Sequence, residues 1–167
     1  MQEIKLRTAT LEDIEALEIF EQGIIQYERP FAPQLKPDPI HYYAIEDLIQ
    51  NKDACFVIAE LNDRPIGCGY GIIQKSKPTK KERHHAYLGF MYVIPKQRGK
   101  GVNAMVIQYL IDWANSKGLT EIVLEVYSEN KSAVKAYKKI GFQPGLVKMR
   151  LNTEELVEGK LKVRALE

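Results

Sequence analysis

The sequence predicts a mixed α/β (α+β) domain, and the order of its patterns carries this prediction. A strand and helices come first, antiparallel hairpin strands follow, and one strand–helix–strand unit comes later in the chain. The chain has 167 residues, of which 45% are hydrophobic, and this suits one domain around a single core. We therefore expect a single domain over residues 1–167, without internal repeats or low-complexity segments.

The first predicted elements are a strand over residues 3–10 and a helix over residues 11–27. The strand, EIKLRTAT, alternates apolar and polar side chains, and the helix carries apolar residues at helical spacing. Thr10 stands three residues before Asp13, which is the capping-box pattern that opens a helix.

Residues 28–39 are predicted to form a loop. They hold four of the eight prolines, and this excludes a regular helix or a central strand. A second helix is predicted over residues 40–51. Because a long irregular stretch inside a compact domain is often functional, the loop is a candidate site.

Hairpin strands are predicted in the middle of the chain. Strands over 54–61 and 65–76 flank NDR, a hairpin signal, and three glycines in the second strand indicate a bulge or a close backbone approach. The charged stretch 75–84 is predicted to be a solvated turn. A third strand covers 85–94, and its alternation predicts one shared face for His85, Tyr87, Gly89, Met91 and Val93.

The last part of the chain predicts alternating helices and strands. A helix over residues 102–118 ends at a glycine, a strand covers 121–127, and a helix over 128–142 also has a glycine stop. A final strand is predicted over 146–151, and the tail after Thr153 is ambiguous.

Charge and cysteine content exclude several classes of partner. The net charge of +2 gives no electrostatic case for a nucleic acid or an acidic membrane, so neither is expected. Cys55 and Cys68 lie in apolar runs and predict small buried side chains rather than a disulfide framework. Without a signal-peptide pattern or a long apolar span, the sequence predicts a cytoplasmic protein.

The stretch YVIPKQRGKGVNAM, residues 92–105, joins a predicted strand to a predicted helix through a basic, glycine-containing loop. Its basic side chains and glycines are Lys96, Arg98, Lys100, Gly99 and Gly101. A helix N-terminus carries unpaired N–H groups and the positive end of the helix dipole, and glycines let phosphate oxygens approach the backbone. The loop therefore predicts a pyrophosphate site.

Two known phosphate-binding patterns, the dinucleotide-binding glycine motif and the P-loop, do not account for this loop. Gly99 to Ala104 matches G-x-G-x-x-G/A, with Glu129 in the region of a ribose-binding acid. However, Pro95 to Arg98 intervene between strand and turn, and about 40 residues follow the second strand, which is too few for a doubly wound domain. A P-loop is excluded because G-x-x-x-x-G-K-[ST] does not occur.

A different resemblance explains more residues. The stretch YLGFMYVIPKQRGKGV resembles motif A of the GCN5-related N-acetyltransferases (GNAT), as Arg98-x-x-Gly101-x-Asn103, with Asn103 in place of the usual final Gly or Ala. The stretch LEVYSENKSAVKAYKKIGF resembles the family's motif B, and the matching residues are Asn130, Ala133, Tyr137, Gly141 and Phe142. The two motifs occur in the family's order and separation over about residues 86–145.

The resemblance implies a central, mostly antiparallel sheet with a splayed strand pair, flanked by helices. Pantetheine of acetyl-CoA would lie in the splay, between Met91 to Val93 and the region of Val126. Residues of about 86–145 would bind this co-substrate, and about 10–52 would face the acceptor. The implied acetyl-CoA contacts are Met91, Tyr92, Val93, Arg98, Gly99, Lys100, Gly101, Val102, Asn103, Ala104, Asn130 and Tyr137.

The implied activity is direct acetyl transfer from acetyl-CoA to a primary amine, without a metal or a covalent enzyme intermediate. The resemblance makes Tyr137 the acid that protonates the departing thiolate, because a phenol can donate to it. Asn130 would cap its helix or contact the co-substrate. The base stays open: His85, Glu125 acting through a water, and a water chain with no dedicated base are the alternatives.

The acceptor amine is not fixed by these motifs. Aromatic and acidic residues of the early helices and loop could form a wall for a cation: Tyr27, Glu28, Phe31, Tyr42 and Tyr43, with Tyr87 nearby on its strand. A small, metabolite-like amine is preferred to a polybasic protein tail, since the loop has no marked acidic cluster. A CoA- or nucleotide-binding regulatory module without catalysis, a protein N-acetyltransferase and a homodimer stay open.

Overall fold

The computed structural model describes residues 3–155 and divides into two compact units, one ending at Asn130 and one beginning at Lys131. The first unit contains a five-stranded sheet of order β1-β2-β3-β4-β5, in which only the β4–β5 pair is parallel. The strands are β1 (Ile4–Thr8), β2 (Ala54–Leu61), β3 (Arg64–Lys75), β4 (His84–Val93) and β5 (Ile122–Leu124). The predicted mixed α/β class with a mostly antiparallel sheet is confirmed.

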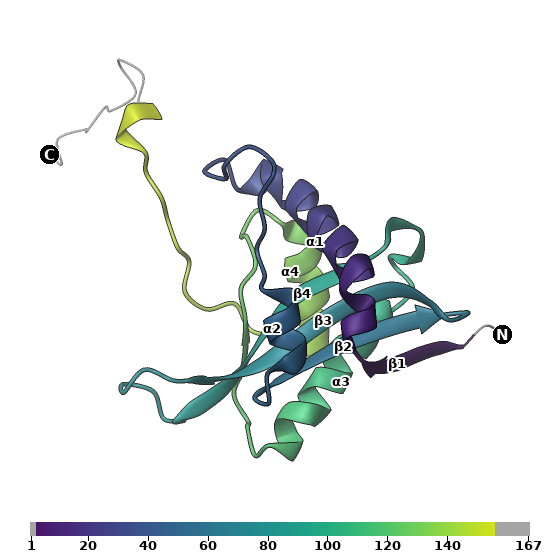
Figure 1. Cartoon of the computed structure of the whole chain (residues 1–167). Coiled ribbons are helices and arrows are strands. Elements are labelled where there is room, and N and C mark those ends of the chain that lie inside the picture. Colours follow the sequence, from purple (N-terminus) through teal and green to yellow (C-terminus); the bar gives the residue numbers. More distant parts are fainter. Residues whose placement is uncertain (1–2, 156–167) are drawn as a thin grey trace, which may run out of the picture. The chain divides into compact units, whose positions relative to one another are not determined.

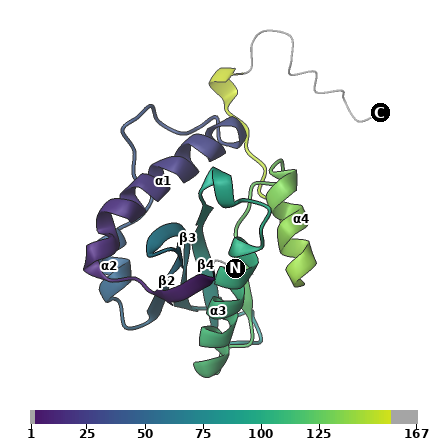
Figure 2. The ribbon, with the colours of Figure 1, turned by 90° about the vertical axis from the view of Figure 1, so that its right-hand side faces the viewer.

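Helices cover both faces of this sheet (Figures 1 and 2). The helices of the first unit are α1 (Ile14–Glu28), α2 (Ile45–Gln50) and α3 (Val102–Ser116). α1 and α2 pack on one face, where Leu17, Phe20 and Ile45 meet Phe56 and Phe90. α3 covers the other face with buried apolar residues of its own.

The glycines of β3 allow the close approach that the sequence predicts. A Cβ atom at Gly69 would lie 2.6 Å from the Met91 sulfur and 2.8 Å from a Val106 methyl carbon of α3. A Cβ atom at Gly71 would lie 2.8 Å from the Trp113 ring. Because real Cβ atoms do not approach so closely, α3 can pack on this strand only where glycines stand.

The start of α1 uses the predicted capping box. The Thr10 N–H donates to the Asp13 carboxylate at 2.7 Å, and a short 3-10 turn, Leu11–Asp13, precedes the α-helix. The guanidinium of Arg7 binds Asp13 and also Glu60 of β2, which ties β1 to the helix start. The Arg7 hydrogen bonds lower the pKa of the buried Asp13 carboxyl group.

The second predicted helix, over 40–51, is wrong in its first half, because α2 begins only at Ile45. The preceding residues are not helical, since the backbone N–H groups of Tyr42 and Tyr43 donate to the Glu21 carboxylate at 2.7 and 2.8 Å. Glu21 lies on α1 and is 0% exposed. A buried carboxylate from another helix therefore replaces the hydrogen bonds that a first helical turn would leave unmade.

The predicted common face of His85, Tyr87, Gly89, Met91 and Val93 is also wrong, because a bulge interrupts β4. Phe90 has a left-handed φ of 53°, and the β3–β4 register shifts beside it. Gly89 faces the Tyr70 ring and Phe90 stacks on Tyr43, so both point to the α1–α2 face. Met91 then points to the α3 face against Gly69. One extra residue reverses the alternation after it.

The β4–β5 pair parts after three residue pairs. The parallel register runs from Ala86 and Ile122 to Leu88 and Leu124, where β5 ends. The predicted strand over 121–127 is therefore longer than the observed one. β4 continues to Val93 without a partner on this edge from β5, which gives the splayed pair that the resemblance implies.

The second unit contains α4 (Lys131–Ile140) and a short 3-10 turn at Thr153–Glu155. α4 ends as predicted at Gly141, which has a φ of 121°. The final strand predicted over 146–151 is wrong: these residues pair with no strand in the described chain, and Leu146 and Met149 are largely exposed. The part of the ambiguous tail over residues 156–167 lies outside the described residues.

Candidate functional site

The loop between β4 and α3, residues 94–101, opens the N-terminus of α3. Gly101 is the N-cap residue with a φ of 83°, and Gly99 has a φ of 75°. A Cβ atom at either position would meet no other atom within 4 Å. The glycines are needed for the left-handed backbone, and the space beside them is open.

The first turn of α3 offers backbone donors. Its first helical hydrogen bond runs from the Met105 N–H to the Gly101 carbonyl at 3.1 Å, so the N–H groups of residues 102–104 have no acceptor within the helix. No side chain caps this end, and no acidic residue stands in the first turn. Val102, Asn103 and Ala104 thus present backbone donors at this helix end, where the sequence predicts a pyrophosphate site.

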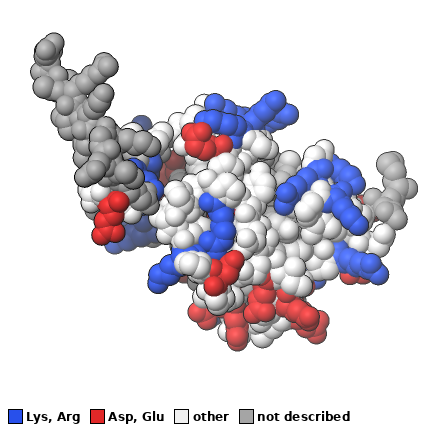
Figure 3. All heavy atoms as spheres, turned by 90° about the horizontal axis from the view of Figure 1, so that it is seen from above, with Lys and Arg blue, Asp and Glu red and all other residues white. Residues whose placement is uncertain are grey.

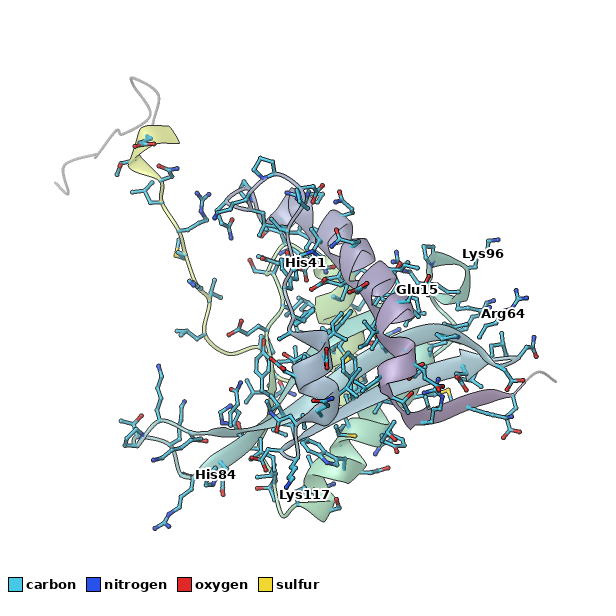
Figure 4. The ribbon with its side chains drawn as sticks, viewed as in Figure 1. Glu15, His41, Arg64, His84, Lys96 and Lys117 are labelled. Atoms are coloured by element: carbon cyan, nitrogen blue, oxygen red, sulfur yellow. The ribbon has the colours of Figure 1, made fainter. Side chains whose placement is uncertain are left out.

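Basic side chains surround the same loop. Lys96 is exposed, and Figure 4 shows it directed outward near Arg64 of β3. The Lys100 ammonium group donates to the Gln97 side chain at 3.0 Å. Seen from above, basic side chains lie beside acidic ones over much of the surface, and a group of acidic side chains lies along the lower edge of the view (Figure 3). The loop therefore combines helix N–H groups with local positive charge.

Arg98 makes contacts within the protein that the sequence did not predict. Its backbone N–H donates to the Pro95 carbonyl at 3.3 Å, so this group is used inside the turn. Its Nε donates to the Val93 carbonyl at 2.9 Å, and its guanidinium carbon lies 5.2 Å from the Tyr27 ring centre and 5.6 Å from that of Tyr92. Arg98 joins the loop to β4 and to the end of α1.

The last residues of β4 present an edge toward the side that β5 leaves. The Ile94 N–H donates to the Ile66 carbonyl of β3 at 2.9 Å. Because alternate residues of an antiparallel ladder face opposite edges, the peptide groups of Val93 face away from β3. The Arg98 bond to the Val93 carbonyl agrees with this direction. The predicted donor edge at Met91 to Val93 thus lies past the end of β5 pairing.

A group of aromatic and acidic residues forms the second part of the candidate site. We call it the tyrosine cluster, and its members are Tyr27, Glu28, Phe31, Tyr42, Tyr43 and Tyr127. Phe31 meets Tyr27 edge-on at 6.1 Å and stacks on Tyr127 at 6.4 Å between ring centres. The end of α1, the segment before α2 and the residues after β5 come together here.

Titrating groups in the tyrosine cluster are desolvated. Burial raises the pKa of Glu28, although an interaction with Tyr42 opposes the shift. Burial raises the pKa of Tyr42, and the charges of Glu28 and Tyr127 add to this shift. The Tyr127 pKa rises through burial, Glu28 and Glu125. The Glu28 carboxylate therefore acts on tyrosines from two other segments.

Tyr43 joins the cluster to β4. Its ring stacks on Phe90 at 4.4 Å between ring centres, beside the bulge, and meets Tyr42 and Tyr70 edge-on at 5.8 Å each. Tyr87 of β4 packs against the apolar core on the α1–α2 face, which includes Tyr70 and Phe90. The predicted acceptor residues on the early segments therefore come together in the first unit, next to β4.

The candidate bases lie in different places. His85 stands opposite Gln74, and its Nδ1 lies 2.9 Å from the Ser76 hydroxyl. This position is near the hairpin end of β4, before the residues that still pair with β5, so the structure does not bring His85 to the splay. Glu125 directly follows β5 and raises the pKa of Tyr70 after the larger effect of burial.

The motif B residues lie at the start of and within α4. Asn130 is buried, directly precedes the helix, and its N–H donates to the Tyr127 carbonyl at 2.9 Å. Tyr137 meets the Phe142 ring edge-on at 6.0 Å, and its carbonyl accepts from the Gly141 and Phe142 N–H groups at the helix end. The roles of both side chains stay predictions.

Two site features were missed from the sequence. Glu21 is one, and its signal was present: it falls between Leu17 and Ile25 at four-residue spacing, on the buried stripe of α1. A buried charge needs hydrogen-bond partners to offset the loss of water. Besides the Tyr42 and Tyr43 N–H groups, Glu21 has His41, whose Nδ1 lies 2.8 Å from the carboxylate. Tyr127 is the other, and only the parting of β5 reveals it.

Three further findings concern metal ions, membrane spans and the two cysteines. Across residues 3–155, no group of three or more His, Cys, Asp and Glu side chains is arranged to hold a metal ion. Within the same residues, every helix is too short or too polar to cross a membrane. Cys55 and Cys68 are buried and unpaired with each other, as expected.

Comparison with known proteins identifies the family. The acetyltransferase (GNAT) family profile matches residues 21–142, which is most of the chain. The chain belongs to this family. The resemblance drawn from motifs A and B is thereby confirmed.

Curated relatives match part of the chain. A thialysine N-epsilon-acetyltransferase from Bos taurus is 37% identical over 79 residues, 47% of this chain and 46% of that protein. N-alpha-acetyltransferase 30 from Saccharomyces cerevisiae is 33% identical over 78 residues, 47% of this chain and 43% of that protein. The matched segment spans less than half of the length of each.

Solved structures match the fold more fully. A protein from Clostridium acetobutylicum described as a predicted acetyltransferase, solved with acetyl-CoA, has a TM-score of 0.68 and 22% identity, covering 92% of this chain and 98% of that one. At this identity the likeness shows the shared GNAT fold.

Proposed function

We propose that this protein transfers an acetyl group from acetyl-CoA directly to a primary amine, and that its two units act as one N-acetyltransferase domain. The observation that carries the proposal is the pair of left-handed glycines that opens the N-terminus of α3 beside a strand pair that parts after Leu88. An extended thioester arm and its pyrophosphate need such an edge and such a helix end, and the GNAT family supplies the chemistry.

The residues of the loop fit a pyrophosphate. The N–H groups of Val102, Asn103 and Ala104 would donate to it, and Lys96 and Lys100 would add positive charge. A Cβ atom at Gly99 or Gly101 would project into the open space beside these donors. Arg98 would hold the loop against β4 rather than serve mainly as a phosphate ligand.

The reacting carbonyl would lie along the free edge of β4. Within the stretch Met91 to Val93, the Val93 N–H group, which faces away from β3, would donate to the thioester oxygen and stabilise the negative charge that develops as the amine attacks. Tyr137 would donate a proton to the thiolate that leaves. Its placement as acid rests on the motif B resemblance.

The tyrosine cluster would receive the amine. Aromatic faces of Tyr27, Phe31 and Tyr127 and the carboxylate of Glu28 suit a substrate that arrives as a cation. The thialysine acetyltransferase relative acts on a small amine, as its name states, and this supports a metabolite-sized acceptor. The N-alpha-acetyltransferase relative keeps a protein N-terminus as the second candidate.

The experiment has two steps. Mass spectrometry of the purified protein under native conditions should detect bound CoA or acetyl-CoA, and thiol release should then follow addition of one member of an amine panel. The panel should include diamines, amino acids with basic side chains and short peptides. Bound CoA without turnover on any amine would favour a regulatory module, and a larger thermal shift with NAD than with CoA would refute the CoA site.

A further inference from the structure

Glu28 lies where β4 and β5 part, because its neighbours contact both sides of the splay. Tyr27 packs against Arg98, whose Nε is bonded to the Val93 carbonyl of β4. Phe31 stacks on Tyr127, which follows β5. The last turn of α1 therefore lies beside the edge proposed to hold the thioester, and the Glu28 carboxyl group of that turn faces Tyr127, which follows β5.

The surroundings of Glu28 leave its carboxylate without a cationic partner. In residues 3–155 no salt bridge involves it, and the adjacent Arg29 binds Asp38 instead. The groups that face it from other segments are the Tyr42, Tyr43 and Tyr127 hydroxyls, all with raised pKa values, so they are neutral near pH 7. Burial, with no cation to offset it, makes this carboxyl group hold a proton more strongly than an ordinary glutamate.

A second observation points to a polar ligand at the same place. The Tyr42 hydroxyl is the buried side-chain polar atom that lacks a hydrogen bond of good geometry in the described part of the chain. It lies near Glu28, whose charge adds to the rise of its pKa after burial. A buried hydroxyl without a partner is rare in folded proteins, and a bound amine would supply one.

Resting on the proposed acetyl transfer, we propose that Glu28 is the general base of the reaction, with the Tyr42 hydroxyl as hydrogen-bond partner of the incoming amine. Neither His85 nor the strand positions at Tyr87 and Gly89 offers a base at the splay, whereas Glu28 comes to it from α1.

The proton transfers balance as follows. The ammonium group of the acceptor gives one proton to the Glu28 carboxylate, and the neutral nitrogen attacks the thioester carbon. The C–N bond forms and the C–S bond breaks. The second nitrogen proton is lost as the amide forms, the CoA thiolate is protonated, and Glu28 returns its proton to solvent. The net change is one amide, one thiol and one released proton per ammonium consumed.

The test compares Glu28→Gln with Glu18→Gln, an exposed glutamate on the same helix. With an accepted alkyl amine and saturating acetyl-CoA, Glu28→Gln should lower kcat/KM about 10²-fold near pH 7. The loss should shrink as pH approaches the pKa of the amine, because the substrate then arrives neutral. Glu18→Gln should leave the profile unchanged.

A weakly basic acceptor gives the sharpest comparison. A fluorinated analogue of the accepted amine is already neutral near pH 7, so Glu28→Gln should change its kcat/KM by only a few fold. Tyr42→Phe should raise KM for the alkyl amine several fold with little change in the melting temperature, since the hydroxyl makes no hydrogen bond of good geometry within the protein.

Three outcomes would overturn the assignment. An equal loss for both amines at every pH, with KM raised and kcat kept, would make Glu28 a binding carboxylate only. Full activity of Glu28→Gln would remove it from the mechanism. A wild-type protein inactive on every amine would overturn the proposed function first and the inference with it. The Glu28→Gln melting temperature, expected at or above wild type, shows that the variant is folded.

Discussion

The β4–α3 loop and the tyrosine cluster are assembled from very different distances along the chain. The loop is held by bonds between near neighbours, such as Arg98 to Pro95 and Met105 to Gly101. The tyrosine cluster depends on Glu21, which binds the backbone of Tyr42 from 21 positions away. The loop can therefore be predicted from local sequence, whereas the residues of the tyrosine cluster come together only when the sheet and helices pack.

This difference separates the shared part of the activity from its variable part. A local motif keeps its geometry through its own glycines and helix end, so we expect the proposed phosphate site to vary little among related proteins. A cluster made from three distant segments changes whenever one of them changes. We therefore expect substitutions in the loop to alter acetyl-CoA kinetics, and those behind the cluster to alter amine kinetics.

The largest expected effect tests a residue that local sequence assigns without help from packing. Tyr137→Phe removes one hydroxyl and should lower kcat about 10²-fold, with KM for acetyl-CoA within a few fold, if the phenol protonates the thiolate. Single-turnover acetyl transfer measures this, because slow product release can mask a chemical defect.

Tyr109→Phe is the matched control, since it also removes one tyrosine hydroxyl, but from α3. It should leave kcat unchanged. Single-turnover transfer at the wild-type rate in Tyr137→Phe would show that solvent protonates the thiolate and that Tyr137 is a packing residue.

The next effect concerns the loop and has a control of equal backbone strain. Gly101 and Gly118 both have left-handed backbones, with φ of 83° and 74°, and a Cβ atom at either meets nothing within 4 Å. Alanine at either position should cost about 1–2 kcal/mol in the free energy of unfolding. Only Gly101→Ala should also raise KM for acetyl-CoA, by about tenfold, because its methyl group lies beside the phosphate donors.

Equal acetyl-CoA affinities in the two folded variants, measured by calorimetry, would remove the phosphates from this loop. A rise in KM for the amine alone in Gly101→Ala would contradict the division between the two regions.

The elements predicted from sequence are those whose causes are local. The capping box of Thr10 and Asp13, the Asn62–Asp63 hairpin turn with φ of 53° and 58°, and the glycine stop of α4 are each written within a few residues. The splayed pair followed from the family resemblance.

The errors share a different cause, because each depends on a partner far along the chain or on one inserted residue. A bulge at Phe90 reverses the facing of Met91 and Val93, and strand alternation alone cannot reveal it. The first half of the predicted second helix is lost to the Glu21 carboxylate. The apolar alternation over 146–151 resembles a strand, but alternation supplies no partner edge.

A moderate effect is expected behind the tyrosine cluster. Glu21→Ala leaves the Tyr42 and Tyr43 N–H groups without their acceptor and should lower the free energy of unfolding by about 2–3 kcal/mol. It should also raise KM for the amine while KM for acetyl-CoA stays constant. Denaturant unfolding and the two KM values measure this.

Glu21→Gln serves as the conservative partner, since one amide oxygen can still accept from both N–H groups. It should recover most of the stability and the amine KM. If Glu21→Ala changed KM for both substrates alike, the cluster and the loop would not be separable.

The smallest effect belongs to Arg98, the residue that touches both regions. Its Nε bonds the Val93 carbonyl and its guanidinium lies near the Tyr27 and Tyr92 rings, so its planar shape matters as well as its charge. Arg98→Lys keeps the charge and loses the stacking geometry, whereas Lys96→Ala loses an exposed charge of the same loop and no packing contact. The pair therefore separates packing from electrostatics.

If Arg98 acts by packing, Arg98→Lys should raise KM for both acetyl-CoA and the amine about two- to threefold, since it loosens the loop and the end of α1 together, and added salt should not change the ratio to wild type. Lys96→Ala should raise KM for acetyl-CoA alone, by a similar factor that fades as salt screens the phosphate charge. Wild-type kinetics in Arg98→Lys, together with a salt-dependent loss in Arg98→Ala, would instead make Arg98 a phosphate ligand. The link between the two regions would then have to run through β4 and its bulge at Phe90, where Tyr43 stacks.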